Sequence, residues 1–210
     1  MAETSSFIHR FEKGAEADAL PLLLLHGTGG DENDLIPLGR MIAPEAPLLS
    51  PRGKVLENGM SRFFRRFAEG RFDEDDVRRR AHELADFVDQ ARAHYAIAPP
   101  VALGYSNGAN IAAALLLLRP QTLAGGILMR ATLPLSQTPP VDLAGKPVLI
   151  ASGAMDPMML PEGAARLAAR LQQDGASVEH RILPSGHELS QADVTIAQAW
   201  LRSHAQPVAR

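Results

Sequence analysis

Short, continuously apolar runs that end at a glycine or a small polar residue constrain the fold of this chain most. LPLLLLHG at residues 20–27 is the clearest case, and VALGYS at residues 101–106 and KPVLIASG at residues 146–153 repeat the pattern. Such runs suit strands buried on both faces, which occur in parallel sheets covered by helices. Longer segments with helical spacing separate the runs. The sequence therefore predicts an α/β fold with a mostly parallel central sheet and helices on both faces.

The remaining segments extend the same alternation. Residues 73–96 open with acidic side chains and then place apolar residues on one side, as an amphipathic helix requires; these are Val77, Leu84, Phe87 and Val88. Further strands are expected at residues 46–51, 123–129 and 177–184, and further helices at residues 31–43, 107–118, 161–175 and toward the C-terminus through Trp200. The chain has 210 residues and shows no linker or repeat, so one domain over residues 1–210 is expected.

Composition removes several classes of function. The formal net charge is -3, which argues against a nucleic-acid-binding protein. The chain has no cysteine, so disulfides, thiolate metal sites and a cysteine nucleophile are excluded, and the histidine spacings predict no other metal site. Residues 1–14 lack the apolar core of a signal peptide, and no segment is long enough to span a membrane. A cytoplasmic location is the simplest expectation.

The segment LGYSNGAN contains the motif G-x-S-x-G, formed by Gly104, Ser106 and Gly108. The motif lies between an apolar run and an apolar helical segment, where a tight turn would project the serine oxygen beyond the sheet. Two glycines let such a turn close without a Cβ clash. A glycine-rich turn with an incidental serine is the alternative, but the position between strand and helix favours a nucleophile.

A serine nucleophile needs a base and an acid that orients the base, and in this class of fold the chain order is serine, acid, histidine. Asp156 follows one predicted strand in ASGAMDP, and His187 follows the next in LPSGHELS. Taken singly, Asp156 could open an Asp-Pro turn and His187 could be a surface or capping histidine. Together with Ser106, in the required order, they predict a catalytic triad.

Acyl transfer through serine also needs two donors for the oxyanion. The backbone N–H of Asn107, next to the nucleophile, is one candidate, and the backbone N–H of Thr28 in the loop HGTGG is the other. His26 in the same loop is expected to orient the loop rather than to act as the base. A phosphate-binding loop is excluded, because neither G-x-x-x-x-G-K-[ST] nor G-x-G-x-x-G is present.

Residues 50–67, SPRGKVLENGMSRFFRRF, combine five basic residues and three phenylalanines with one acid. This stretch follows a predicted strand, so as a long loop it should lie near Ser106 at the edge of the sheet where ligands bind. The candidates for substrate contact are Arg52, Asn58 and Arg62, with Phe63, Phe64 and Phe67 as a pocket wall. Arg65 and Arg66 are expected instead to pair with the acids at residues 73–76.

The motifs quoted above resemble the α/β-hydrolase superfamily, specifically its small carboxylesterase/phospholipase branch. Within that branch, residues 49–76 are similar to bacterial serine hydrolases associated with quinone and aromatic-compound stress. The resemblance implies a fold without a lid domain, no cofactor, Ser106, Asp156 and His187 as the triad, and Thr28 and Asn107 as oxyanion donors. The chain departs from the resemblance at Arg130 and Ala131, where relatives often have a His-Pro-like pair, so a different pocket rim is expected.

The sequence thus predicts a serine hydrolase that cleaves short-chain carboxylic esters through an acyl-enzyme. Because Arg binds carboxylates bidentately, esters that carry a carboxylate, such as those of aromatic catabolism, are the favoured substrates. A thioesterase or lysophospholipase is the alternative enzyme, and a non-catalytic ligand-binding protein is the alternative of another class. The expected partner is a small-molecule ester, with no nucleic acid and no membrane, and a homodimer is left open.

Overall fold

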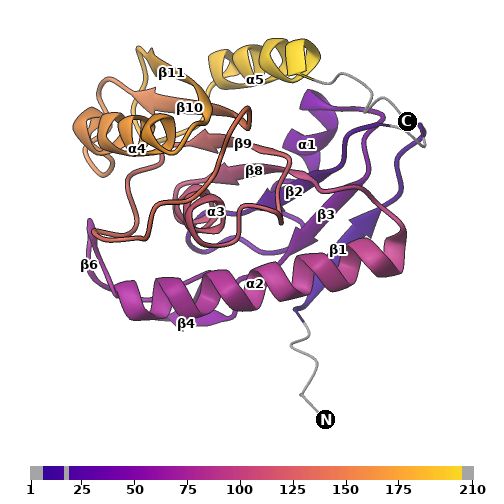
Figure 1. Ribbon diagram of the computed structural model, residues 1–210, viewed down its shortest axis with the longest axis horizontal. Helices are drawn as coiled ribbons and strands as arrows, with labels where there is room; N and C mark the ends of the chain where they lie inside the picture. The colour runs from indigo at the N-terminus through magenta and orange to yellow at the C-terminus, as the bar shows by residue number, and fades with distance from the viewer. Residues whose placement is uncertain (1–6, 17–18, 205–210) are drawn as a thin grey trace.

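The computed structural model describes residues 7–16 and 19–204, and its centre is a seven-stranded sheet. The strands follow the order β1-β3-β2-β8-β9-β10-β11 across the sheet (Figure 1). Their bounds are β1 His9–Glu12, β2 Leu22–Leu25, β3 Leu48–Pro51, β8 Val101–Tyr105, β9 Gly125–Met129, β10 Pro147–Gly153 and β11 Ser177–Leu183. Only the edge strand β1 runs antiparallel to its neighbour. The predicted α/β class with a mostly parallel sheet is confirmed.

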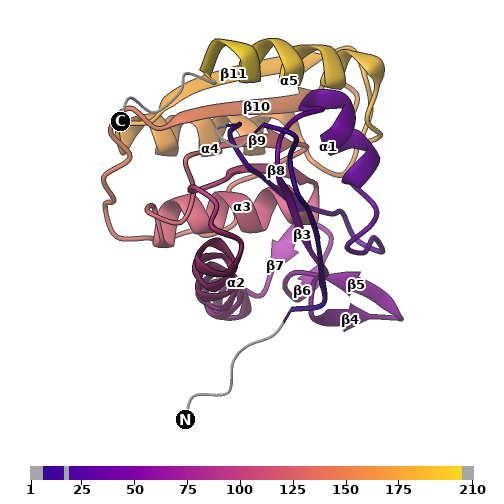
Figure 2. The same ribbon diagram turned by 90° about the vertical axis from the view of Figure 1, so that its right-hand side faces the viewer.

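Helices cover both faces of the sheet, as predicted. One face carries α2 (Glu74–Tyr95), α3 (Asn107–Leu118) and α4 (Pro161–Gln173), and the other carries α1 (Ile36–Ile42) and α5 (Gln191–His204). Figure 2 shows α1 and α5 above the strands, with α3 and α2 below them. None of the described helices is both long and apolar enough to cross a bilayer.

The central strands are apolar throughout because both of their faces are covered. All four residues of β2 are fully buried: Leu23 and Leu25 pack toward α2 and α3, and Leu22 and Leu24 pack toward α1 and α5. A strand with alternating polar residues would place charges in one of these two cores. This explains why continuous apolar runs identified the central strands.

Two local predictions differ from the structure. The helix expected over residues 31–43 begins only at Ile36, because residues 31–35 form turns in which Asp31 accepts a hydrogen bond from the Asn33 N–H at 2.8 Å. The stretch after β3 is not a plain loop. It contains two small two-stranded antiparallel sheets, formed by β4 (Val55–Glu57) with β5 (Met60–Arg62) and by β6 (Arg66–Ala68) with β7 (Arg71–Phe72).

Candidate active site

The strand β8 ends and the helix α3 begins at a single residue, Ser106. Its backbone has φ 52° and ψ -113°, a conformation that costs about 1–3 kcal/mol for a residue with a side chain. A Cβ on Gly108 would lie 1.9 Å from the carbonyl oxygen of Leu25, and a Cβ on Gly104 would lie 2.7 Å from Cα of Ala109. The turn therefore needs both glycines of the G-x-S-x-G motif.

A chain of hydrogen bonds joins the three predicted triad residues. Nε2 of His187 lies 3.0 Å from Oγ of Ser106, and Nδ1 of His187 lies 2.8 Å from Oδ2 of Asp156. The buried Asp156 carboxylate is held by the N–H groups of Met158 and Met159, which donate to Oδ1 at 2.8 and 2.9 Å. These bonds fix the carboxylate, which in turn orients the imidazole toward Ser106.

The two predicted oxyanion donors lie on the same side of the site. Asn107 is the first residue of α3, where a helix leaves its N–H groups unpaired. Thr28 stands in the loop after β2, and the next residue donates its N–H to the Ser61 carbonyl at 2.9 Å, which ties this loop to β5. Within the described part of the chain, neither the Thr28 N–H nor the Asn107 N–H donates to a protein acceptor. Both residues line the pocket.

His26 connects the loop after β2 to the segment after β3. Nδ1 of His26 lies 2.6 Å from the Gly27 carbonyl, and Nε2 accepts a hydrogen bond from the Gly53 N–H at 3.0 Å. A ring that donates at one nitrogen and accepts at the other is neutral. Burial lowers the pKa of His26 below its ordinary value of 6.5, which keeps the ring in that form. His26 therefore occupies the loop-orienting position that the sequence predicted.

His26 should make the protein less stable in mild acid. The folded state holds the ring neutral while the unfolded chain takes up a proton near pH 6.5, so its contribution is full above that pH and falls as pH drops below it. We expect His26→Gln to flatten the fall in the free energy of unfolding between about pH 7.5 and about pH 5.5, by at most about 1.4 kcal/mol per pH unit. Urea unfolding at both pH values measures it.

A matched control is His82→Gln, the same change at an exposed position on α2. Burial also lowers the pKa of His180, but this residue is present in every variant and cancels from the comparison. An unchanged pH dependence in His26→Gln, or an equal change in His82→Gln, would contradict the expectation.

A small pocket of about 190 Å³ opens over the triad. Phe72, Met158 and Met159 form its apolar wall, and Thr28, Arg62, Asn107 and Asn110 supply polar groups around Ser106 and His187. Among the described residues, no group of three or more His, Asp or Glu side chains is arranged to hold a metal ion. The pocket thus brings the Ser106 hydroxyl and the His187 imidazole, which are hydrogen-bonded to each other, next to Thr28 and Asn107 and a small apolar wall.

The sequence pattern of the phospholipase/carboxylesterase family matches residues 9–205. The chain belongs to this family. It is 45% identical to the putative hydrolase MhqD of Bacillus subtilis over 196 residues, which are 92% of this chain and 97% of that protein. The crystal structure of the Bacillus cereus carboxylesterase superposes with a TM-score of 0.91 at 44% identity, covering 94% of both chains. The structure of YahD with malic acid superposes with a TM-score of 0.89 at 30% identity, covering 96% of this chain and 100% of that one.

This membership confirms the predicted α/β-hydrolase fold and the predicted enzyme class, a hydrolase that acts on carboxylic esters. The resemblance to the small carboxylesterase/phospholipase branch is confirmed as well. The roles of individual residues rest on the geometry of the site.

Of the residues predicted to contact substrate in this carboxylesterase, only Arg62 lines the pocket. Arg52 does not line the pocket. Its guanidinium donates two hydrogen bonds, of 2.5 and 2.8 Å, to the carboxylate of Glu32. Asn58 is exposed in the β4-β5 turn, where its φ of 52° suits an asparagine. Phe63 and Phe64 are buried in the core next to the pocket rather than on its surface.

The pairing predicted for the neighbouring arginines is half correct. Arg65 pairs with Asp73 at 2.8 Å, as expected. Arg66 pairs instead with Glu57 at 3.0 Å and with Glu69, and it lines the pocket. Arg66 is the first residue of β6, and its two partners lie at the end of β4 and in the turn between β6 and β7 rather than at the start of α2. Phe67, predicted as pocket wall, is exposed.

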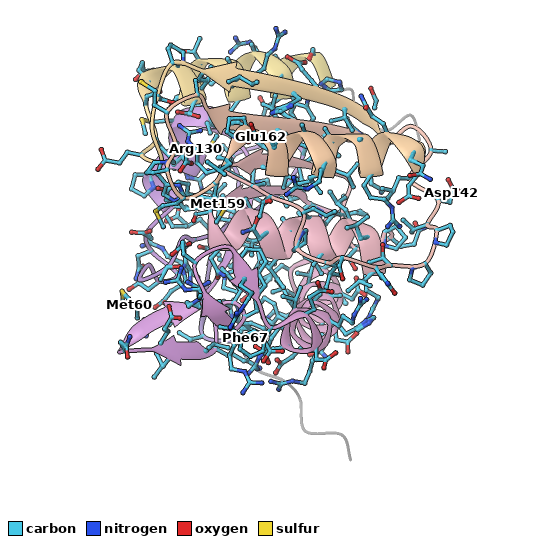
Figure 3. All side chains as sticks on the ribbon, turned by 90° about the vertical axis from the view of Figure 1, so that its left-hand side faces the viewer. Met60, Phe67, Arg130, Asp142, Met159 and Glu162 are labelled. Atoms are coloured by element: carbon cyan, nitrogen blue, oxygen red, sulfur yellow. The ribbon has the colours of Figure 1, made fainter. Side chains whose placement is uncertain are left out.

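Arg130, predicted to alter the pocket rim, is instead buried and does not line the pocket; its side chain is labelled in Figure 3. Its Nε donates to the Gly186 carbonyl at 2.9 Å, and its Nη2 donates to the Glu188 carbonyl at 2.9 Å. Nη1 and Nη2 also bind the two carboxylate oxygens of Asp193 at 2.7 and 3.0 Å. Arg130 thus holds the residues on either side of His187 and links them to α5.

The sequence analysis did not predict the Arg130–Asp193 pair, although a helix-capping motif in the sequence includes Asp193. Ser190 and Asp193 have the S-x-x-D spacing of a capping box, and Oδ2 of Asp193 accepts the Ser190 N–H at 2.8 Å. Burial raises the pKa of Asp193, but hydrogen bonds from Arg130 and Ser190 outweigh it and hold the pKa below its ordinary value. The carboxylate is therefore charged and paired with Arg130 at neutral pH.

Proposed function

We propose that Ser106 is the nucleophile of this carboxylesterase and that it forms an acyl-enzyme. The observation that carries the proposal is the continuous hydrogen-bonded chain from Ser106 through His187 to the buried Asp156. This arrangement is assembled before substrate binds, which a protein that only binds ligands would not need.

The proposed cycle has two acyl transfers. Nε2 of His187 takes the proton of Ser106 Oγ while Oγ bonds to the ester carbonyl carbon, and the resulting oxyanion is held by the N–H groups of Thr28 and Asn107. His187 then gives this proton to the departing alcohol oxygen as the carbon–oxygen bond breaks. In the second transfer His187 takes a proton from water while the hydroxide oxygen bonds to the acyl carbon. His187 then returns this proton to Ser106 Oγ as the bond between Oγ and the acyl carbon breaks, which releases the acid. Asp156 orients the imidazole and stabilises its charged form.

The size of the pocket favours short acyl chains. Its volume of about 190 Å³ is below the roughly 300–1,000 Å³ of sites for drug-sized ligands. A lysophospholipase or a long-chain thioesterase needs a longer apolar groove than Phe72, Met158 and Met159 provide. We therefore propose esters of small acids as the substrates.

An acidic group on the substrate is the finer proposal. Arg62 lines the pocket with its side chain only 3% exposed, and its Nη1 donates to Thr28 Oγ1 at 2.6 Å beside the oxyanion hole. The structure of YahD, which shares the fold at 30% identity, is one with malic acid. Both observations support a carboxylate-bearing ester. The cytoplasmic location expected from the sequence and the homodimer left open there stay predictions.

The experiment compares two short esters that share a leaving group, one with a neutral acyl group and one with a carboxylate on it, and Ser106→Ala as the blank. We expect wild-type hydrolysis of both esters above the blank. A preference for the anionic ester that Arg62→Met removes would support the acidic substrate, and a preference for the neutral ester would reject it. No hydrolysis of either ester would reject the short-chain esterase.

A further inference from the structure

Two asparagines in the first turn of α3 line the catalytic pocket, and each has a buried side-chain NH₂ group that no described protein group accepts from. Asn107 and Asn110 both line the pocket, and they are 2% and 0% exposed. Their spacing of three residues places them on one face of the helix, with Cβ atoms about 5–6 Å apart. This face follows directly from Ser106, so both amides lie beside the nucleophile.

The orientation of both amides is determined by a backbone partner. Oδ1 of Asn107 accepts the Phe63 N–H at 2.7 Å, and Oδ1 of Asn110 accepts the Thr132 N–H at 2.9 Å. Because a backbone N–H can only donate, the oxygen of each amide must face it and the NH₂ group must face the other way. Within the described part of the chain, neither Nδ2 has a hydrogen-bond partner.

Buried donors without a partner are rare in folded proteins, and each calls for an explanation. Neither amide needs its NH₂ group for the fold, since only Oδ1 contacts the backbone. The two free NH₂ groups occur together, in one pocket and on one helix face. This coincidence indicates a ligand that accepts hydrogen bonds from both.

The surrounding charges indicate what kind of acceptor the amides suit. The pocket arginines are each opposed by a carboxylate, Arg62 by Glu57 at 3.4 Å and Arg66 by Glu57 and Glu69. Side-chain charge around the pocket is therefore close to balanced. The amides themselves are neutral donors, and the N-terminus of α3 adds a modest positive potential. An oxygen with free lone pairs, charged or not, is the natural partner.

The position of the two amides beside Ser106 indicates which part of the substrate carries the acceptor oxygen. The leaving alcohol must lie next to His187, which delivers its proton, and the acyl carbon is attached to Ser106. The first turn of α3 begins directly after Ser106, to which the acyl carbon would be attached. We propose that Asn107 and Asn110 form a subsite for a second oxygen on the acyl group, such as an alkoxy, hydroxy, oxo or carboxylate oxygen close to the scissile carbonyl. This inference rests on the proposed function and names the substrate class of the same site.

The test uses para-nitrophenyl butanoate and para-nitrophenyl methoxyacetate, in which one CH₂ of the acyl chain is replaced by oxygen. Asn110→Asp keeps the oxygen that accepts the Thr132 N–H and removes the donors. We expect the ratio of kcat/KM for methoxyacetate to that for butanoate to fall about 5- to 10-fold in this variant. Comparing ratios between variants cancels the intrinsic reactivity of the two esters, and both esters are neutral, so Arg62 does not bias the result.

Two further variants complete the test. Asn107→Asp keeps the bond from the Phe63 N–H, removes the other donor pair, and gives the result if Asn110→Asp does not fold. Asn58→Asp makes the same chemical change on the exposed β4-β5 turn and should leave the ratio unchanged. An unchanged ratio in the folded pocket variants, or an equal fall in Asn58→Asp, overturns the subsite. If the wild type hydrolyses neither ester above Ser106→Ala, the proposed function fails first and the subsite fails with it.

Discussion

Ser106→Ala is expected to lower kcat for a short-chain ester by a factor on the order of 10⁶, the size of effect seen when a triad serine is removed. The reason is that no other oxygen replaces Oγ, which lies 3.0 Å from Nε2 of His187. The same variant should lose covalent labelling by a fluorophosphonate, which captures a serine activated by its base. Initial hydrolysis rates and the mass of the labelled peptide measure both effects.

The first control is a double variant, because the effects of removing two residues of one catalytic unit do not add. Ser106→Ala combined with His187→Ala should be no worse than Ser106→Ala alone, because the base has no function without its nucleophile. Ser203→Ala, the same change on the exposed side of α5, should leave rate and labelling intact. Labelling that persists in Ser106→Ala would place the nucleophile at another serine and remove the basis of the proposed cycle.

Much of the fold was predictable because a strand that is buried on both faces has apolar residues at every position. The residues of β2 are apolar at every position, and the apolar spacing of α2 gave its buried side. The candidate triad was predictable for a similar reason. Each member follows the carboxyl end of a strand in a parallel sheet, and those ends meet at one edge.

Contacts between distant segments were not predictable from local patterns. Arg52 looked free to bind substrate, but Glu32 lies 20 positions earlier in the chain and reaches it only in the folded state. Phe63 and Phe64 were predicted to form a pocket wall, but both are buried in the core, because the sequence does not say which side of the chain faces the pocket. Asn110 carried one usable signal, its position one helical turn after Ser106. Its free donor became visible only with the Thr132 N–H in place.

Arg130→Met is expected to destabilise the protein by about 3–5 kcal/mol, because it leaves the buried Asp193 carboxylate without its counter-ion. Both side chains of this pair are 0% exposed. Methionine keeps an unbranched side chain without the guanidinium, and it leaves unchanged the backbone strain of a non-glycine residue at φ 58°. Urea unfolding at neutral pH measures the loss of stability. We also expect kcat to fall more than KM rises, since the Gly186 and Glu188 carbonyls beside His187 lose their donor.

The double variant Arg130→Met/Asp193→Asn separates stability from positioning. Asparagine removes the unpaired charge and keeps an oxygen for the Ser190 N–H, so the double variant should be more stable than Arg130→Met alone. Its kcat should stay low, because the carbonyls of Gly186 and Glu188 still lack the guanidinium that fixes the His187 loop. If kcat returned together with stability, Arg130 would only stabilise the fold. If stability returned and kcat did not, the buried pair would position the base by holding the backbone on either side of His187, while Asp156 holds the His187 ring.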